Sequence, residues 1–159
     1  MKTADGDSAP VTVARVRRPA DDWRAAIHLA CEPLVEVNAV ASGYPDRCVA
    51  MVEEHGPYIV LAPGIALAHA RPEDGVEVAC LAVVTLTEAV DFGHEANDPV
   101  DVVFAFGSPD ADQHVGMLSE LARHLIDGLA DRLRQADDDA DATMLLRRVT
   151  GGNGHDSPG

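Results

Sequence analysis

The histidine at position 69 stands in a setting that suits a nucleophile. It closes an apolar run that begins at Ile65, and it is flanked by Ala68 and Ala70, whose small side chains would let another molecule approach the ring. One imidazole nitrogen can attack a phosphoryl group while a hydrogen bond to the other nitrogen fixes the ring. His69 is therefore the first candidate for covalent chemistry, although the same spacing also fits a histidine without a chemical role.

His114 is the second candidate. It follows Asp110 and Asp112, which are placed to cap a helix. The unpaired N–H groups at the start of such a helix favour an anion nearby, so a histidine in the first turn could bind or orient a phosphoryl group on His69. The alternative is a first-turn histidine that only faces solvent.

Arg71 lies two residues beyond His69, so the two side chains share one face if the strand continues. Its guanidinium could then pair with phosphoryl oxygens. Equally, it could be a charge at the rim that pairs with Glu73 or Asp74. The sequence leaves these two interpretations open.

One further set of polar residues, His94, Glu95 and Asp98, contains side chains of the types that bind metals and would suit a metal-dependent hydrolase. Its spacing, His-Glu-x-x-Asp, differs from the His-Glu-x-x-His pattern of zinc enzymes, and Pro99 argues against a helix there. We therefore expect no metal site.

Helices and strands alternate along the chain, which predicts an α/β layered domain. The expected divisions are an N-terminal tail with an edge strand (1–19), the domain (20–149) and a disordered C-terminal tail (150–159), and residues 1–10 are also expected to be disordered. Strands are predicted over 11–16, 58–62, 65–69, 76–87 and 100–107. Helices are predicted over 22–38, 46–55, 108–128, 131–135 and 140–149, with a loop over 91–99.

Composition disfavours several classes of partner. The 159 residues carry a net charge of −15, which disfavours nucleic acid and anionic membrane surfaces and favours a basic protein partner. No apolar run approaches the length of a membrane span, so no direct membrane insertion is expected. Cys31, Cys48 and Cys80 form no Cys-x-x-Cys pair, so we expect buried free thiols in a reducing cytoplasm.

Four blocks of the sequence together resemble one family. They are Gly56 to Gly75 around His69, Leu81 to Val100, Val103-Phe104, and Asp110-Ala-Asp-Gln-His114. These blocks are similar to the enzyme IIA components of the phosphoenolpyruvate-dependent sugar phosphotransferase system, of the mannitol/fructose type and its ascorbate-like branch. The resemblance covers roughly residues 20 to 148, a normal size for one domain. Several blocks in order are more specific than any single motif.

The resemblance implies a mixed sheet with helices on both faces and a cytoplasmic phosphocarrier that needs no metal or organic cofactor. His69 would accept a phosphoryl group as tele-phosphohistidine from the small carrier protein HPr. It would pass the group to a cysteine of an enzyme IIB component, which serves a IIC membrane permease for an ascorbate-like sugar. His114 matches the family's second active-site histidine. The segment around Asp98 would be a structural loop in which Asn97 and Asp98 bond backbone groups.

Two departures from the family pattern and three rival functions accompany this interpretation. Ala68 stands where the family usually has proline, which predicts a softer site, and Glu53-Glu54-His55 stands where the mannitol branch carries an arginine. The rivals are a regulatory phosphoprotein of the same fold, the metal-dependent hydrolase, and a degenerate domain kept for assembly. The sequence leaves both a monomer and a homodimer open.

Overall fold

Five strands form one mixed sheet in the order β2-β5-β6-β4-β3 in the computed structural model, which describes residues 10–150. β4 runs parallel to β6 and β2 parallel to β5, while β5–β6 and β3–β4 are antiparallel. Residues 1–9 and 151–159, where the sequence predicts disorder, lie outside the described residues. The strands are β2 (Val11–Arg18), β3 (Val60–Ala62), β4 (Ile65–Ala68), β5 (Cys80–Val90) and β6 (Val100–Gly107).

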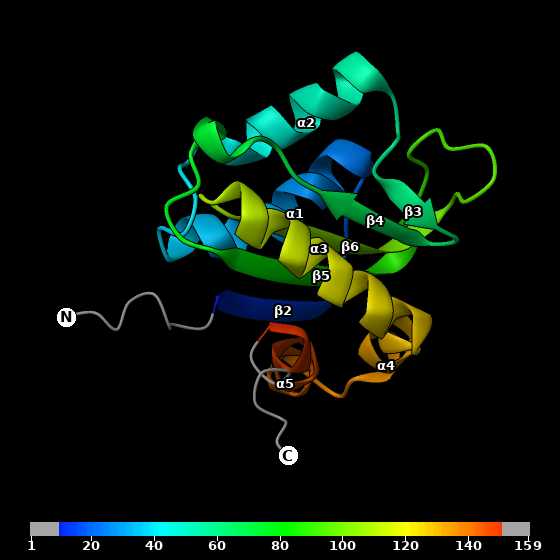
Figure 1. Cartoon of the computed structure of the whole chain (residues 1–159). Coiled ribbons are helices and arrows are strands. Elements are labelled where there is room, and N and C mark those ends of the chain that lie inside the picture. The colour runs from blue at the N-terminus through cyan, green and yellow to red at the C-terminus, as the bar shows by residue number, and fades with distance from the viewer. Residues whose placement is uncertain (1–9, 151–159) are drawn as a thin grey trace.

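Helices cover both faces of this sheet, as Figure 1 shows, with α1 behind it and α3 in front. The helices α1 (Trp23–Glu36) and α2 (Tyr44–His55) pack on one face, and α3 (Ala111–Ile126), α4 (Leu129–Gln135) and α5 (Asp139–Thr150) pack on the other. The predicted α/β class with helices on both faces is therefore confirmed. Among the described helices, none is long and apolar enough to cross a membrane.

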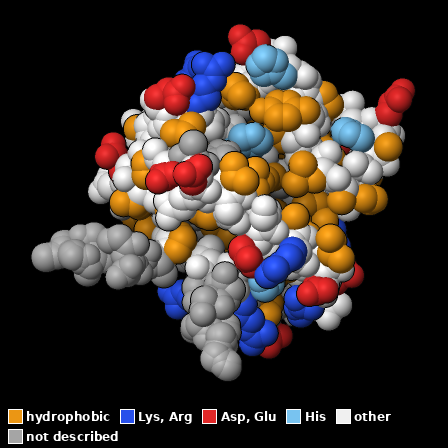
Figure 2. Space-filling model, viewed as in Figure 1, with side chains coloured by type: hydrophobic (Ala, Val, Ile, Leu, Met, Phe, Trp, Pro, Cys, Tyr) orange, Lys and Arg blue, Asp and Glu red, His pale blue; other side chains and the backbone are white. Residues whose placement is uncertain are grey.

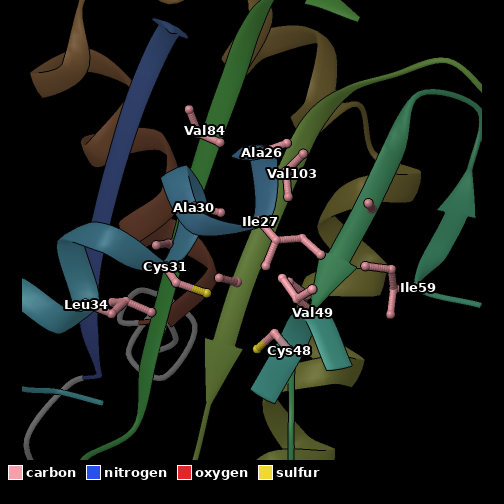
Figure 3. Close-up of a cluster of buried hydrophobic side chains, with 14 of the residues drawn as sticks. Ala26, Ile27, Ala30, Cys31, Leu34, Cys48, Val49, Ile59, Val84 and Val103 are labelled. Atoms are coloured by element: carbon pink, nitrogen blue, oxygen red, sulfur yellow. The ribbon is translucent and has the colours of Figure 1, made fainter. Parts of the chain in front are cut away.

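Two apolar layers result because the central strands are buried on both faces. Ala82 and Val84 of β5 face α1 and α2, whereas Leu81 and Val83, one residue out of step, face α3 to α5. Such continuous apolar runs are typical of a strand between two helical layers. Figure 3 shows the first layer, in which α1 lies against β5 and β6 through Ala26, Ile27, Ala30, Cys31 and Leu34.

Element types agree with the sequence prediction, but several boundaries differ. The helix expected from residue 46 begins at Tyr44, because Pro45 fits the first helical turn, where its missing N–H costs nothing. The strand expected over 76–87 runs from Cys80 to Val90. Val115 has the helical spacing of the apolar positions Leu118 and Leu121 in α3, yet its side chain is 62% exposed. Leu121 of α3 and the side chains of α4 and α5 fill that layer.

α5 is fastened to the edge strand β2 by Asp139. Its carboxylate accepts hydrogen bonds from the N–H of Val16 (2.9 Å) and from the guanidinium of Arg18 (2.7 Å). Burial alone would raise the pKa of Asp139, but Arg18 and the N–H of Val16 outweigh it, so that this pKa lies below its usual value.

We expect Asp139→Asn to weaken the fold near neutral pH and to make it less sensitive to acid. A carboxyl with a depressed folded-state pKa contributes stability above its unfolded-state pKa and loses it as the pH falls through the folded value. The variant should lose about 1 kcal/mol of unfolding free energy at neutral pH. Urea unfolding near pH 7 and at about pH 3 should show this difference shrinking in acid. A difference that is the same at both pH values would contradict the assignment.

Candidate functional site

His69 is the first residue after β4, at the edge where the parallel strands β4 and β6 both end. Its side chain is half-buried, and Nδ1 lies 3.1 Å from the carbonyl oxygen of Leu67. Because a carbonyl oxygen can only accept, Nδ1 carries the proton and donates it. A neutral ring in this tautomer has its lone pair on Nε2, so Nε2 is the nitrogen equipped to attack an electrophile.

Two aromatic rings contact the imidazole. The ring centroid of Tyr58 lies 5.9 Å from that of His69 in an edge-on arrangement, and the centroid of Phe106 lies 5.7 Å away. Tyr58 in turn contacts His55, the last residue of α2, at 6.2 Å. Figure 2 shows histidine and hydrophobic side chains gathered on one face over the end of α2 and the strands β3 and β4. These contacts place the half-buried ring in a mostly apolar surface.

Neither Tyr58 nor His55 was predicted as a site residue from the sequence. Tyr58 was treated only as the start of a strand, whereas β3 begins two residues later and Tyr58 lies in the turn before it. Burial raises the pKa of Tyr58, so its hydroxyl stays protonated at neutral pH. The spacing His-Gly-Pro-Tyr, with Gly56 ending α2 at a φ of 86°, is the signal that could have placed this ring near the strand ends.

The start of α3 lies at the same edge of the sheet, because it follows β6 directly. Asp110 is its cap: the carboxylate accepts from the N–H groups of Asp112 (2.8 Å) and Gln113 (3.3 Å). The hydroxyl of the buried Ser108 accepts from the N–H of Asp110 (3.1 Å) and so fixes the approach to the helix. His114 belongs to the first turn of α3, but its side chain lies outside the described residues.

Arg71 does not continue the strand. It is exposed and precedes a short 3-10 helix, η1 (Pro72–Asp74), with its N–H donating to the Asp74 carboxylate at 3.0 Å. That carboxylate pairs instead with the guanidinium of Arg47, at 3.4 Å. Within residues 10–150 the Arg71 guanidinium forms no ion pair, so the pairing with Glu73 or Asp74 that the sequence left open is not observed.

The loop before β6 uses its polar groups to hold itself together. The Asp98 carboxylate accepts from the N–H groups of Phe92 (3.0 Å), Gly93 (2.7 Å) and His94 (2.9 Å). His94 Nδ1 accepts from the N–H of Asn97 at 3.1 Å, and the Asn97 carbonyl accepts from Gly64. The part of the chain that the structure describes contains no cluster of three or more side chains suited to a metal ion. The structural-loop interpretation of Asp98 is confirmed.

Comparisons with known proteins agree on one family. The family model described as "Phosphoenolpyruvate-dependent sugar phosphotransferase system, EIIA 2" matches residues 11–149. The ascorbate-specific PTS system EIIA component of Shigella boydii is 36% identical over 137 residues, covering 85% of this chain and 89% of that protein.

The fold of this chain also resembles solved structures. The mannitol-specific cryptic phosphotransferase enzyme IIA of Escherichia coli superposes with a TM-score of 0.76 at 27% identity, covering 90% of this chain and 97% of that one. Enzyme IIA for mannitol from Escherichia coli, in its complex with phosphorylated enzyme IIB, superposes with a TM-score of 0.70 over 84% of this chain and 92% of that one. At 23% identity, this second likeness concerns the fold alone.

Proposed function

We propose, from the premise that this chain belongs to the EIIA type-2 family of the phosphoenolpyruvate-dependent sugar phosphotransferase system, that His69 is its phosphoryl acceptor. As a member of that family, the chain transfers phosphoryl groups between proteins through a phosphohistidine. The observation that carries the assignment is the bond from His69 Nδ1 to the Leu67 carbonyl, because it sets Nε2 as the nucleophilic nitrogen.

The transfer then follows from the tautomer. The Nε2 lone pair attacks phosphorus on phosphohistidine of HPr, a P–N bond forms, and the P–N bond to HPr breaks with its electron pair returning to the donor imidazole. In the second step a cysteine thiolate of enzyme IIB attacks, and the electron pair of the broken bond returns to Nε2. The proton stays on Nδ1 throughout, hydrogen-bonded to the Leu67 carbonyl, so the chain mainly positions the ring.

We assign His114 and Arg71 to binding the transferred phosphoryl group. His114 belongs to the first turn of α3, at the sheet edge where β4 ends, and its Asp-x-x-His setting matches the family's second histidine. The positive end of α3 favours an anion there. Arg71 is exposed two residues from His69, and its guanidinium is available for phosphoryl oxygens.

The family and its relatives support the partners that we propose for this chain. HPr is the phosphoryl donor and a cysteine of IIB is the acceptor, and IIB in turn serves a IIC membrane permease. The transfers between these proteins take place on the cytoplasmic side. The Shigella boydii relative is ascorbate-specific, which supports an ascorbate-like sugar. The mannitol protein of the same fold assembles with phosphorylated IIB, which supports a IIB partner here. A net charge of −15 suits the steering of a basic carrier toward this chain.

Transfer of the phosphoryl group from this chain to a IIB protein tests the transport role. The chain is charged with phosphoenolpyruvate, enzyme I and HPr, freed from them, and mixed with an ascorbate-type IIB or with IIB whose active cysteine is replaced by serine. We expect the phosphate to leave this chain and appear on IIB, and to stay on this chain with the serine variant. Retention with the intact IIB would overturn the transport role and favour a regulatory phosphoprotein of the same fold.

A further inference from the structure

A buried tyrosine lies directly beneath the site. Tyr44, the first residue of α2, has no exposed surface, and its hydroxyl bridges two backbone groups. The hydroxyl accepts a hydrogen bond from the N–H of Ala70 at 3.0 Å and donates one to the carbonyl of Phe106 at 2.9 Å. Ala70 directly follows His69, and the Phe106 ring contacts the His69 ring. One hydroxyl therefore joins both strands that carry the site.

The register of the sheet shows what this hydroxyl replaces. β4 and β6 pair in parallel from Ile65 opposite Val102 to Ala68 opposite Ala105, which would place His69 opposite Phe106. A parallel ladder continued by that register would bond the N–H of Ala70 directly to the carbonyl of Phe106. These are the two groups that Tyr44 bridges, so the phenol oxygen is inserted into the next bond of the ladder.

The inserted oxygen separates the strands at His69. Two successive hydrogen bonds through an oxygen span more than one direct bond, so β4 ends at Ala68 and the histidine leaves the sheet. Packing around the hydroxyl is close: a Cβ added at Gly107 would lie 3.3 Å from it and 2.9 Å from Val76. Burial raises the pKa of Tyr44, which keeps the hydroxyl protonated and able to donate.

We infer that Tyr44 is a positioning residue for phosphoryl transfer, because its hydroxyl holds β4 and β6 apart at His69 and thereby sets the direction of the imidazole. This inference rests on the proposed role of His69 as acceptor. Without the hydroxyl, Ala70 and Phe106 can bond directly, the ladder extends through His69, and the ring turns with the backbone. The Nδ1 bond to Leu67, which fixes the nucleophilic nitrogen, then changes as well.

Tyr44→Phe tests the inference, since it removes one oxygen and keeps the ring. We expect phosphoryl uptake from phospho-HPr to slow by about tenfold or more, because misdirected nucleophiles lose that much rate. The ¹⁵N signals of the His69 ring should shift from those of the wild type. Uptake at the wild-type rate with unchanged ring signals would overturn the inference.

Thr143→Val is the matched control. The Thr143 hydroxyl also bridges two backbone groups, accepting from the N–H of Ala14 at 3.0 Å and donating to its carbonyl at 3.3 Å, but between α5 and β2. Its loss should lower stability without changing the uptake rate or the His69 signals. Equal slowing in both variants would make the effect of Tyr44 one of general stability and would overturn the inference.

Two further arms keep the outcomes separate. If Tyr44→Phe does not fold, 3-fluorotyrosine can replace Tyr44 as the only tyrosine of a Tyr58→Phe chain. Fluorine strengthens the phenol as a donor and weakens it as an acceptor, so the His69 ¹⁵N signals should shift relative to the unlabelled chain, and unchanged signals would overturn the inference. If the wild type takes up no phosphate, the proposed function fails, and the role of Tyr44 in phosphoryl transfer fails with it. Shifted ring signals in Tyr44→Phe would then show only that the hydroxyl sets the direction of the imidazole.

Discussion

A His69→Ala chain is expected to take up no phosphate from phospho-HPr, whereas the wild type gains one acid-labile phosphate. The variant lacks the Nε2 lone pair that the Leu67 carbonyl sets up through Nδ1, so no P–N bond can form at this position. Intact-mass analysis after incubation with phosphoenolpyruvate, enzyme I and HPr gives the readout, and a brief acid treatment should remove the added mass.

The neighbouring histidine supplies the control for this experiment. His55 contacts Tyr58, which contacts His69, yet His55 lies at the exposed end of α2. His55→Ala should therefore be phosphorylated like the wild type. Full phosphorylation of His69→Ala, with HPr shown to be charged, would move the acceptor to another residue and refute the assignment.

The candidate nucleophile of the site could be predicted from the sequence, but the tyrosine beneath it could not. His69 stood out because small residues flank it after an apolar run, and both features are local. Tyr44 could not be found in this way, because it precedes Ala70 by 26 residues along the chain. In sequence it stands between Gly43 and Pro45, which predicts a turn, and only the packing of α2 on the sheet brings its hydroxyl to the strand ends.

The same distinction explains the fold. β6 was predicted with its true limits, because Gly107 and the loop before Val100 bound an apolar run that Asp101 alone interrupts. The start of β5 was predicted too early, because residues 76–79 are apolar enough to be read as part of the following strand. The backbone of these residues bonds elsewhere: the N–H groups of Glu77 and Val78 donate to the carbonyl of Ala39. Partners of that kind are set by tertiary structure, which hydrophobic periodicity does not encode.

Asp98→Ala is expected to lower the free energy of unfolding by about 2 to 3 kcal/mol, the second large effect, because three backbone N–H groups lose one charged acceptor. The Asp98 carboxylate accepts from Phe92, Gly93 and His94, and this loop in turn braces the turn at Gly64 through the Asn97 carbonyl. Urea unfolding followed by circular dichroism measures the change. Asp98→Asn keeps one acceptor oxygen, so its free energy of unfolding should lie between those of the wild type and Asp98→Ala.

Glu95→Ala separates the structural role of this loop from a metal site. Glu95 is exposed, and within the described residues its carboxylate makes no hydrogen bond or ion pair, so its loss should change the unfolding free energy by less than about 0.5 kcal/mol. If His94, Glu95 and Asp98 formed a metal site, loss of either carboxylate would lower the unfolding free energy, and added zinc would stabilise only the wild type. Matching losses in the two variants, together with that zinc effect, would reject the structural account. A large loss confined to Asp98→Ala, unchanged by zinc, identifies the carboxylate as the hydrogen-bonding centre that holds the β5–β6 connection.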